Sequence, residues 1–186
     1  MEIRHARPED AKRICDLAAS IKIDYSDPQK TGFLVYTLDE DGYERRMRSD
    51  LFYVADNGRG IDGFLMCYDD DRLEHMVSGG ILGHEDGIIG FVSRQERPYV
   101  FGDQIGVAPE KTASGIGSAM MRELFRDMRA RQIPKMYVAI LDAPSRNMAS
   151  IDFCTRLGFI PLARVTNSDG KVWGIYRKDL SRSVTG

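Results

Sequence analysis

Hydrophobic residues alternate with polar ones in some stretches of the chain and recur at helical spacing in others. Strands are predicted at residues 2–6, 51–56, 61–68, 99–107, 136–141, 162–166 and 172–177. Helices are predicted to begin near Pro8, Asp41, Ser118 and Asn147. This order predicts one mixed α/β domain over residues 1–186, with a core of about 1–179 and a central sheet of about six or seven strands flanked by helices.

Two pairs of predicted strands are joined by turn-forming residues. Asn57-Gly58 stands between the second and third predicted strands, and this dipeptide between apolar runs is a strong hairpin signal. Asn167-Ser168-Asp169-Gly170 stands between the last two predicted strands. We therefore expect two β-hairpins, one in the first half of the chain and one at its end.

In two segments the hydrophobic residues recur at neither helical nor strand spacing. Residues 24–37 are interrupted by Asp27-Pro28 and Thr31-Gly32, as segments that border a substrate cleft often are. Residues 69–98 are glycine-rich and too long for an ordinary loop, so we expect substrate contacts there. Within them, Ile88–Ser93 is interpreted as a short strand and Asp69-Asp70-Asp71 as a solvated turn.

Composition excludes some classes of function. The 186 residues include 26 Lys and Arg against 28 Asp and Glu, a formal net charge of −2, which does not favour a nucleic-acid partner. Three cysteines without paired spacing and a charged N-terminal stretch favour a reduced, cytoplasmic protein. No apolar run reaches the roughly 20 residues of a membrane span, and the spacing of Cys, His and Asp predicts no metal site.

The segment from Val107 to Gly117 carries the strongest chemical signal. It reads as the end of a strand, a turn and a loop of small residues that opens onto a helix. Such a loop presents backbone N–H groups and the positive end of a helix dipole to an anion, and Gly115 and Gly117 allow a close backbone approach. By itself, this pattern leaves a phosphate site and an ordinary tight loop as alternatives.

A second segment begins at Asn147 and ends in Leu157-Gly158-Phe159. Together with the loop before it, and with the opening Ile3 to Asp10, it resembles the GNAT superfamily of acyl-CoA-dependent N-acyltransferases. The resemblance implies acetyl-CoA as co-substrate and direct attack of a primary amine in a ternary complex. It also implies the cofactor-binding residues: Ile105, Gly106 and Val107 for the pantetheine arm, Thr112, Ala113, Ser114, Gly115, Ile116, Gly117 and Ser118 for the pyrophosphate, and Asn147 and Ser150 beside the pantetheine channel.

The chain departs from the family pattern at three positions. Thr112 replaces an Arg or Gln, and Ala113 replaces a Gly that often follows it. Cys154 stands where many members have the tyrosine that protonates the leaving thiolate. Two interpretations of Cys154 stay open, a catalytic acid and a small buried packing residue. Water or a nearby tyrosine, such as Tyr99 or Tyr137, is the alternative acid.

Asp103 is the candidate base, because it lies on the strand before the loop with apolar neighbours on its face. The alternative is that Asp103 is a carboxylate at a solvent-exposed edge or is paired with an arginine. His75, His84 and Glu85 are weaker candidates. A small amine, an amino acid and a peptide or protein amine all stay open as the acyl acceptor. A homodimer stays open as the oligomeric state. The alternative function is a degenerate GNAT domain that binds acyl-CoA as a sensor or interaction module.

Overall fold

The computed structural model describes residues 1–25, 32–83 and 86–181. Its strands are β1 Glu2–His5, β2 Phe52–Asp56, β3 Ile61–Asp69, β4 Tyr99–Val107, β5 Lys135–Ala143, β6 Ile160–Thr166 and β7 Val172–Asp179. Its helices are α1 Ala11–Ser20, α2 Glu40–Arg46, α3 Asp70–Ser78, α4 Gly87–Val92, α5 Ile116–Ala130 and α6 Met148–Arg156, with 3₁₀ turns η1 Pro8–Asp10 and η2 Pro109–Lys111.

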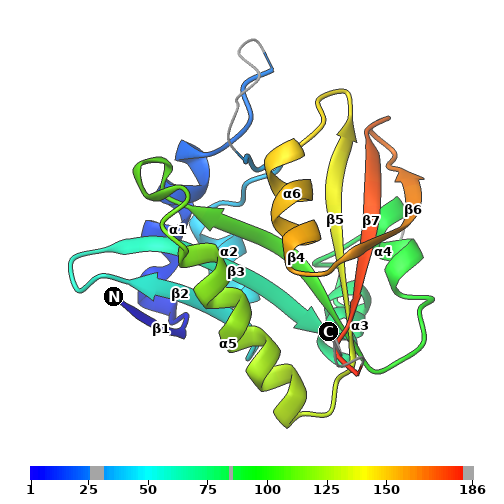
Figure 1. Ribbon diagram of the computed structural model, residues 1–186, viewed down its shortest axis with the longest axis horizontal. Helices are drawn as coiled ribbons and strands as arrows, with labels where there is room; N and C mark the ends of the chain where they lie inside the picture. Colours follow the sequence, from blue (N-terminus) through cyan, green and yellow to red (C-terminus); the bar gives the residue numbers. More distant parts are fainter. Residues whose placement is uncertain (26–31, 84–85, 182–186) are drawn as a thin grey trace. The chain divides into compact units, whose positions relative to one another are not determined.

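The seven strands form one sheet in the order β1-β2-β3-β4-β5-β7-β6 (Figure 1). β4 and β5 are parallel, whereas β1–β2, β2–β3, β5–β7 and β7–β6 are antiparallel. The predicted mixed sheet and both hairpins are therefore confirmed. The chain forms two compact units, residues 1–67 with 103–126 and residues 68–102 with 127–186.

In the first unit, helices cover both faces of the strands (Figure 1). A Cβ placed on Gly106 of β4 would lie 2.7 Å from the side chains of Ile21, at the end of α1, and Phe64. A Cβ placed on Gly63 of β3 would instead meet Ile116 and Met120 of α5. The α1 end and α5 thus pack on opposite faces, each against a strand glycine that allows close approach.

An apolar stripe anchors α5. Its members recur at helical spacing and are all buried: Ile116, Met120, Met121, Leu124, Phe125 and Met128. Because this stripe fixes the helix, it also fixes the position of the loop that precedes the helix.

The second unit contains most of residues 69–98, where the hydrophobic residues showed no clear period, and two predictions there are wrong. Asp69 is not part of a solvated turn, because its side chain accepts a hydrogen bond from Arg72 N–H and caps α3. Gly87–Val92 is helix α4, not a strand, because Asp86 accepts hydrogen bonds from the first N–H groups of that helix. A short apolar run fits either structure, and here the capping residue decides.

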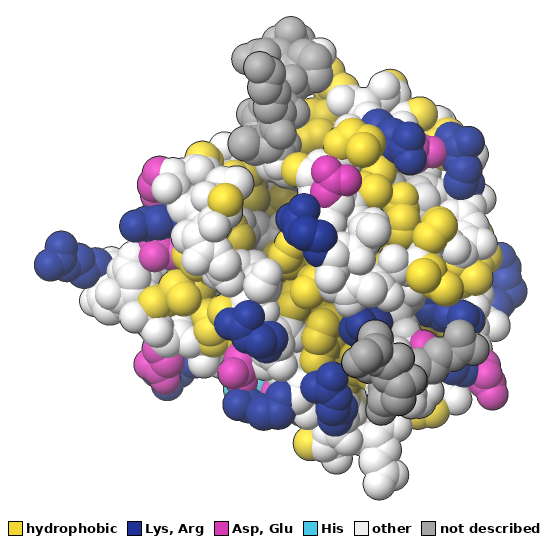
Figure 2. All heavy atoms as spheres, in the orientation of Figure 1, with side chains coloured by type: hydrophobic (Ala, Val, Ile, Leu, Met, Phe, Trp, Pro, Cys, Tyr) yellow, Lys and Arg dark blue, Asp and Glu magenta, His cyan; other side chains and the backbone are white. Residues whose placement is uncertain are grey.

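β6 is an edge strand of the second unit. Ile160 and Leu162 on this strand are 52% and 40% exposed. Figure 2 shows hydrophobic side chains reaching the surface in this region. The homodimer stays a prediction.

Candidate active site

The start of α5 is seated directly on β3. The Gly63 Cα carries no side chain where Ile116 Cγ2 and Met120 Cε approach, and a Cβ there would lie 3.0 and 3.2 Å from these atoms. The sequence pattern did not single out Gly63, although a glycine inside a strand is itself a signal of close approach. This contact of Gly63 with Ile116 and Met120 fixes how closely α5, and the loop that precedes it, approaches the sheet.

The loop before α5 is built from tight turns. Lys111 N–H donates to Ala108 O at 2.8 Å, and Ser114 N–H donates to Lys111 O at 3.1 Å. Ala113 and Gly115 adopt positive φ values of 66° and 85°. Left-handed residues let the chain turn sharply here, and such backbone conformations also occur in anion-binding nests.

The first bond of α5 runs from Ala119 N–H to Gly115 O at 2.9 Å. The N–H groups of Ile116, Gly117 and Ser118 come before it, and helix geometry leaves them without an intrahelical acceptor. The preceding stretch Lys111–Gly115 is exposed to solvent. The site therefore offers several N–H donors and the positive end of a fifteen-residue helix to an anion.

β4 presents a second row of backbone groups. Ala108 N–H, just beyond the strand, donates to Asp62 O of β3 at 2.8 Å. Because backbone groups of successive strand residues point to opposite edges, Gly106 shares this orientation toward β3. The N–H and C=O groups of Ile105 and Val107 consequently point to the other edge of β4.

Asp103 lies on the same face of β4 as Ile105 and Val107, and its side chain is partly exposed. Burial raises the pKa of Cys67 well above the usual thiol value, and the charge of Asp103 raises it further. Burial also raises the pKa of Tyr43, with Asp103 adding to the shift. The carboxylate is thus close enough to the buried interior of the first unit to act on two buried groups.

In the second unit, Asn147 caps α6. Its side chain accepts from Ser150 N–H at 3.2 Å, and its backbone N–H donates to Leu141 O of β5 at 3.0 Å. Asn147 is 5% exposed. Asn147 and Ser150 are therefore brought together by the cap, which fixes where α6 begins.

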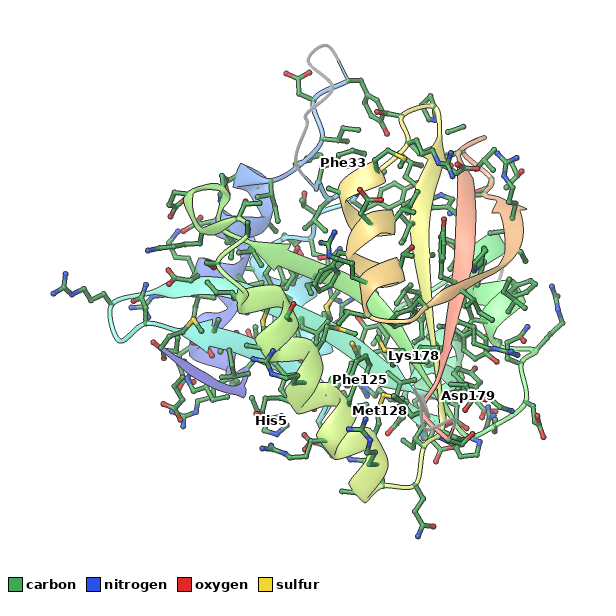
Figure 3. All side chains as sticks on the ribbon, viewed as in Figure 1. His5, Phe33, Phe125, Met128, Lys178 and Asp179 are labelled. Atoms are coloured by element: carbon green, nitrogen blue, oxygen red, sulfur yellow. The ribbon has the colours of Figure 1, made fainter. Side chains whose placement is uncertain are left out.

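The Leu-Gly-Phe sequence ends α6 in a Schellman motif. Phe159 N–H donates to Cys154 O, Gly158 N–H donates to Thr155 O, and Gly158 has a φ of 81°. Lys178 of β7, labelled in Figure 3, donates to Leu157 O at 2.7 Å. Both ends of this short helix are therefore held by specific bonds.

Cys154 is buried on α6, and burial raises the pKa of its thiol to about 12. The thiol is thus protonated at neutral pH but is a weaker acid than an ordinary cysteine. The alternative donors Tyr99 and Tyr137 are also buried, with ring centroids 5.6 Å apart in an edge-to-face contact. Burial raises the pKa of Tyr99 to about 12.

The predicted site residues fall into two groups. Those of β4 and the phosphate loop, Asp103 included, belong to the first compact unit, whereas Asn147, Ser150 and Cys154 belong to the second. His75 is exposed on α3, where its Nδ1 lies 2.7 Å from Asp71 O. His84 and Glu85 lie outside the described residues.

The described residues hold no metal cluster and no membrane span. Within residues 1–25, 32–83 and 86–181, no group of three or more His, Cys, Asp or Glu side chains could hold a metal ion. Nor is any helix within these ranges long and apolar enough to cross a membrane.

A family model identifies the class of protein. The acetyltransferase (GNAT) family model matches residues 16–159, more than half of the chain. The chain belongs to this family, whose general chemistry is acyl transfer. No curated protein sequence matches it.

Solved structures share the fold at low sequence identity. Ard1 from Thermoplasma volcanium is 15% identical, with a TM-score of 0.68 and coverage of 96% of this chain and 97% of that one. Naa20 from Chaetomium thermophilum, in complex with a bisubstrate analogue, is 20% identical, with a TM-score of 0.66 and coverage of 99% and 89%. The ribosomal-protein-S18-alanine N-acetyltransferase from Escherichia coli is 12% identical, with a TM-score of 0.63 and coverage of 100% and 97%.

Proposed function

We propose that the protein transfers an acetyl group from acetyl-CoA to a primary amine by direct attack in a ternary complex. The observation that carries this proposal is the loop before α5, where the exposed residues Lys111–Gly115, turned by Ala113 and Gly115, lead into the first N–H groups of the helix. A pyrophosphate needs this kind of site, because backbone donors and the helix dipole stabilise its negative charge. Family membership supplies the acyl-CoA chemistry.

The pantetheine arm is assigned to β4. The backbone groups of Ile105 and Val107 point away from β3, so an extended amide chain could pair with them as an added strand does. Gly106 faces β3 and serves by keeping this part of β4 close to Ile21 and Phe64. Asn147 and Ser150 are proposed to border the same arm through the start of α6.

Asp103 is proposed to take the ammonium proton of the acceptor. It precedes the pantetheine-pairing residues on the same strand, and a carboxylate is a suitable base for an amine. Cys154 occupies the position of the acid in the family pattern. Its raised pKa favours a packing role, with proton donation by the buried thiol as the alternative that a variant decides.

The acceptor is proposed to be an amine of a small molecule, an amino acid, a peptide or a protein. One fold neighbour is called a ribosomal-protein-S18-alanine N-acetyltransferase, and another is called an agmatine N-acetyltransferase. Because their identities to this chain are low, they extend the range of acceptors to test and do not select one.

The test is calorimetric titration with acetyl-CoA together with a thiol-release assay over a panel of amines. Gly115→Glu is the informative variant, because it places a negative charge at the proposed pyrophosphate position. Gly115→Gln is its matched control, since both variants impose the same strain at a φ of 85° and a Cβ at this position meets no atom within 4 Å. We expect Gly115→Glu to weaken binding at least about tenfold more than Gly115→Gln, as loss of a charge-assisted contact would.

Equal affinities of the two variants would reject the pyrophosphate assignment. Saturable binding by the wild type without turnover would favour the second candidate function, an acyl-CoA-binding sensor. Two observations motivate that candidate: Thr112 provides no cation at the loop, and Ala113 holds a strained left-handed conformation there.

A further inference from the structure

Gln104 of β4 links three separate segments of the first unit. The Tyr43 hydroxyl of α2 donates to Gln104 Oε1 at 3.0 Å, and Gln104 Nε2 donates to Tyr36 O at 3.1 Å. Both polar atoms of the side-chain amide are therefore engaged, one by a helix and one by the backbone before that helix. Gln104 lies one residue before Ile105 and belongs neither to the proposed cofactor contacts nor to the proposed proton-transfer groups.

The Tyr43 end of this link is buried. Tyr43 is 0% exposed, and its ring packs edge-on against Phe64 with centroids 5.8 Å apart. Burial raises the pKa of its hydroxyl, so the group stays a donor at working pH. Gln104 Oε1 accepts a hydrogen bond from this buried hydroxyl, which also has a hydrogen bond with the backbone of Leu38. This fixes the orientation of the amide.

The other end of the link meets an exposed part of the chain. Leu34 exchanges backbone bonds with Ile21 and Ile23, and Phe33 beside it is buried (Figure 3). Further along, Cys15 Sγ donates to Leu38 O at 3.4 Å. Between these anchors, the Tyr36 side chain is 43% exposed. The Gln104 bond therefore holds the middle of residues 33–38.

We propose that Gln104 is a positioning residue that holds residues 33–38 as the wall the acceptor amine meets. The inference rests on the proposed function, which places the thioester arm at Ile105. Because Tyr36 O is bonded to Gln104, the residue before Ile105, the position of residues 33–38 is fixed relative to the acyl donor. Orientation of the two reactants is a large part of what an acyltransferase contributes, since direct attack needs no covalent enzyme intermediate.

The experiment compares Gln104→Leu and Gln104→Glu with the wild type. The leucine removes both hydrogen bonds, whereas the glutamate keeps the acceptor for Tyr43 and loses the donor to Tyr36 O. Acetyl-CoA affinity is measured by calorimetry. Acceptor KM and kcat are measured separately with spermidine, 2-phenylethylamine and a peptide with a free N-terminus. Gln95→Leu is the matched control, because it also removes an amide bond to a backbone carbonyl, that of Phe91, but in the second unit.

We expect both Gln104 variants to raise the acceptor KM about five- to tenfold, the change that one neutral hydrogen bond supports. The kcat and the acetyl-CoA affinity should stay within about twofold, as should every parameter of Gln95→Leu. If Gln104→Leu does not fold, Gln104→Glu, which is nearly the same size as glutamine, carries the test. Tyr43→Phe should give a smaller rise in KM because it keeps the bond to Tyr36 O.

An acceptor KM unchanged in both Gln104 variants would overturn the inference. So would a loss of acetyl-CoA affinity as large as the rise in KM, because that would show a general structural defect. Failure of the wild type to bind acetyl-CoA or to acylate any probe would instead reject the proposed function, and the inference with it. The two failures are therefore distinguished by the wild-type measurement alone.

Discussion

Gly63 of β3 and Ile116 of α5 are separated by less space than one methyl group needs. A Cβ on Gly63 would lie 3.0 Å from Ile116 Cγ2 and 3.0 Å from Gly106 O. One of these atoms belongs to the backbone of β4 and cannot move aside cheaply. The contact therefore couples the packing of the sheet to the position of the proposed phosphate loop.

We expect Gly63→Ala to lower the free energy of unfolding by about 1–3 kcal/mol, the usual range for overpacking a tight site. It should also weaken acetyl-CoA binding, because α5 must shift to accommodate the methyl group. Chemical denaturation and calorimetric titration measure the two effects. Gly60→Ala is the control, because a Cβ there meets no atom within 4 Å. Equal behaviour of the two variants would show that α5 is not seated on Gly63.

Ala113→Gly tests the backbone strain in the loop. Alanine at a φ of 66° costs about 1–2 kcal/mol, and the extra entropy of glycine in the unfolded chain returns about 0.4–1 kcal/mol of that. We expect a net gain in stability of roughly 0.5 kcal/mol, measured by denaturant unfolding. Ala119→Gly, inside α5, should instead lose about 1 kcal/mol. A loss of that size in Ala113→Gly would contradict the left-handed conformation.

Asp103→Asn tests the proposed base. We expect kcat to fall by about 10²- to 10³-fold, the usual contribution of a general base, with acetyl-CoA affinity unchanged. The rate of the wild type should fall as the pH is lowered, since the base must be ionised, and this limb should be lost in the variant. Asp103→Glu should recover part of the activity. A variant as active as the wild type would leave Asp103 as a structural carboxylate.

Cys154→Ala tests the proposed acid. Burial raises the pKa of this thiol to about 12, so proton transfer from it to a thiolate with an ordinary pKa of about 8.5 is uphill. We therefore expect kcat to fall less than about tenfold, below the usual contribution of a general acid. Steady-state kinetics with Cys154→Ser as a second variant of similar size checks this. A fall beyond about a hundredfold in both variants would establish the thiol as the donor.

The sequence predicted the elements whose own residues determine them. Asn57-Gly58 fixes the first hairpin locally, and the apolar stripe of α5 has a strong helical period. Gly158 at a φ of 81° ends α6 where the Leu-Gly-Phe sequence indicates. These features depend on neighbours in the chain, so a single sequence contains the information.

Features that depend on distant partners were missed. α4 is held by Asn167, whose side chain accepts from Ile88 N–H at 3.2 Å across 79 residues. Gly87 lies so close to Thr166 O that no side chain would fit. The bonds of Gln104 to Tyr36 and Tyr43 likewise span more than sixty residues. No local pattern of hydrophobic residues reports such contacts, so the sequence indicated that residues 24–37 border a cleft but not which bonds hold this segment.

Asp10→Asn tests the ion-pair network in which Arg4 of β1 binds Asp10 and Asp56. Arg4 Nη1 and Nη2 bind Asp10 at 2.7 and 2.9 Å, and Arg4 Nε binds Asp56 at 3.0 Å. Burial alone would raise the pKa of Asp10, but the hydrogen bonds from Arg4 and from Arg7 N–H outweigh it and lower the pKa. A lowered pKa in the folded state means stability that is present above the unfolded value of about 3.9 and lost as the pH falls below it.

We expect Asp10→Asn to lower the free energy of unfolding by about 3 kcal/mol at pH 7, because it leaves a largely buried arginine with one partner fewer. The difference from the wild type should shrink below about pH 4, as Asp10 of the wild type becomes protonated. Urea unfolding across pH 3–8 measures both effects. Asp16→Asn, which breaks the exposed pair with Lys12, should change stability by less than about 1 kcal/mol. A difference from wild type that does not vary with pH would mean that packing around Asp10, and not its charge, supplies the stability.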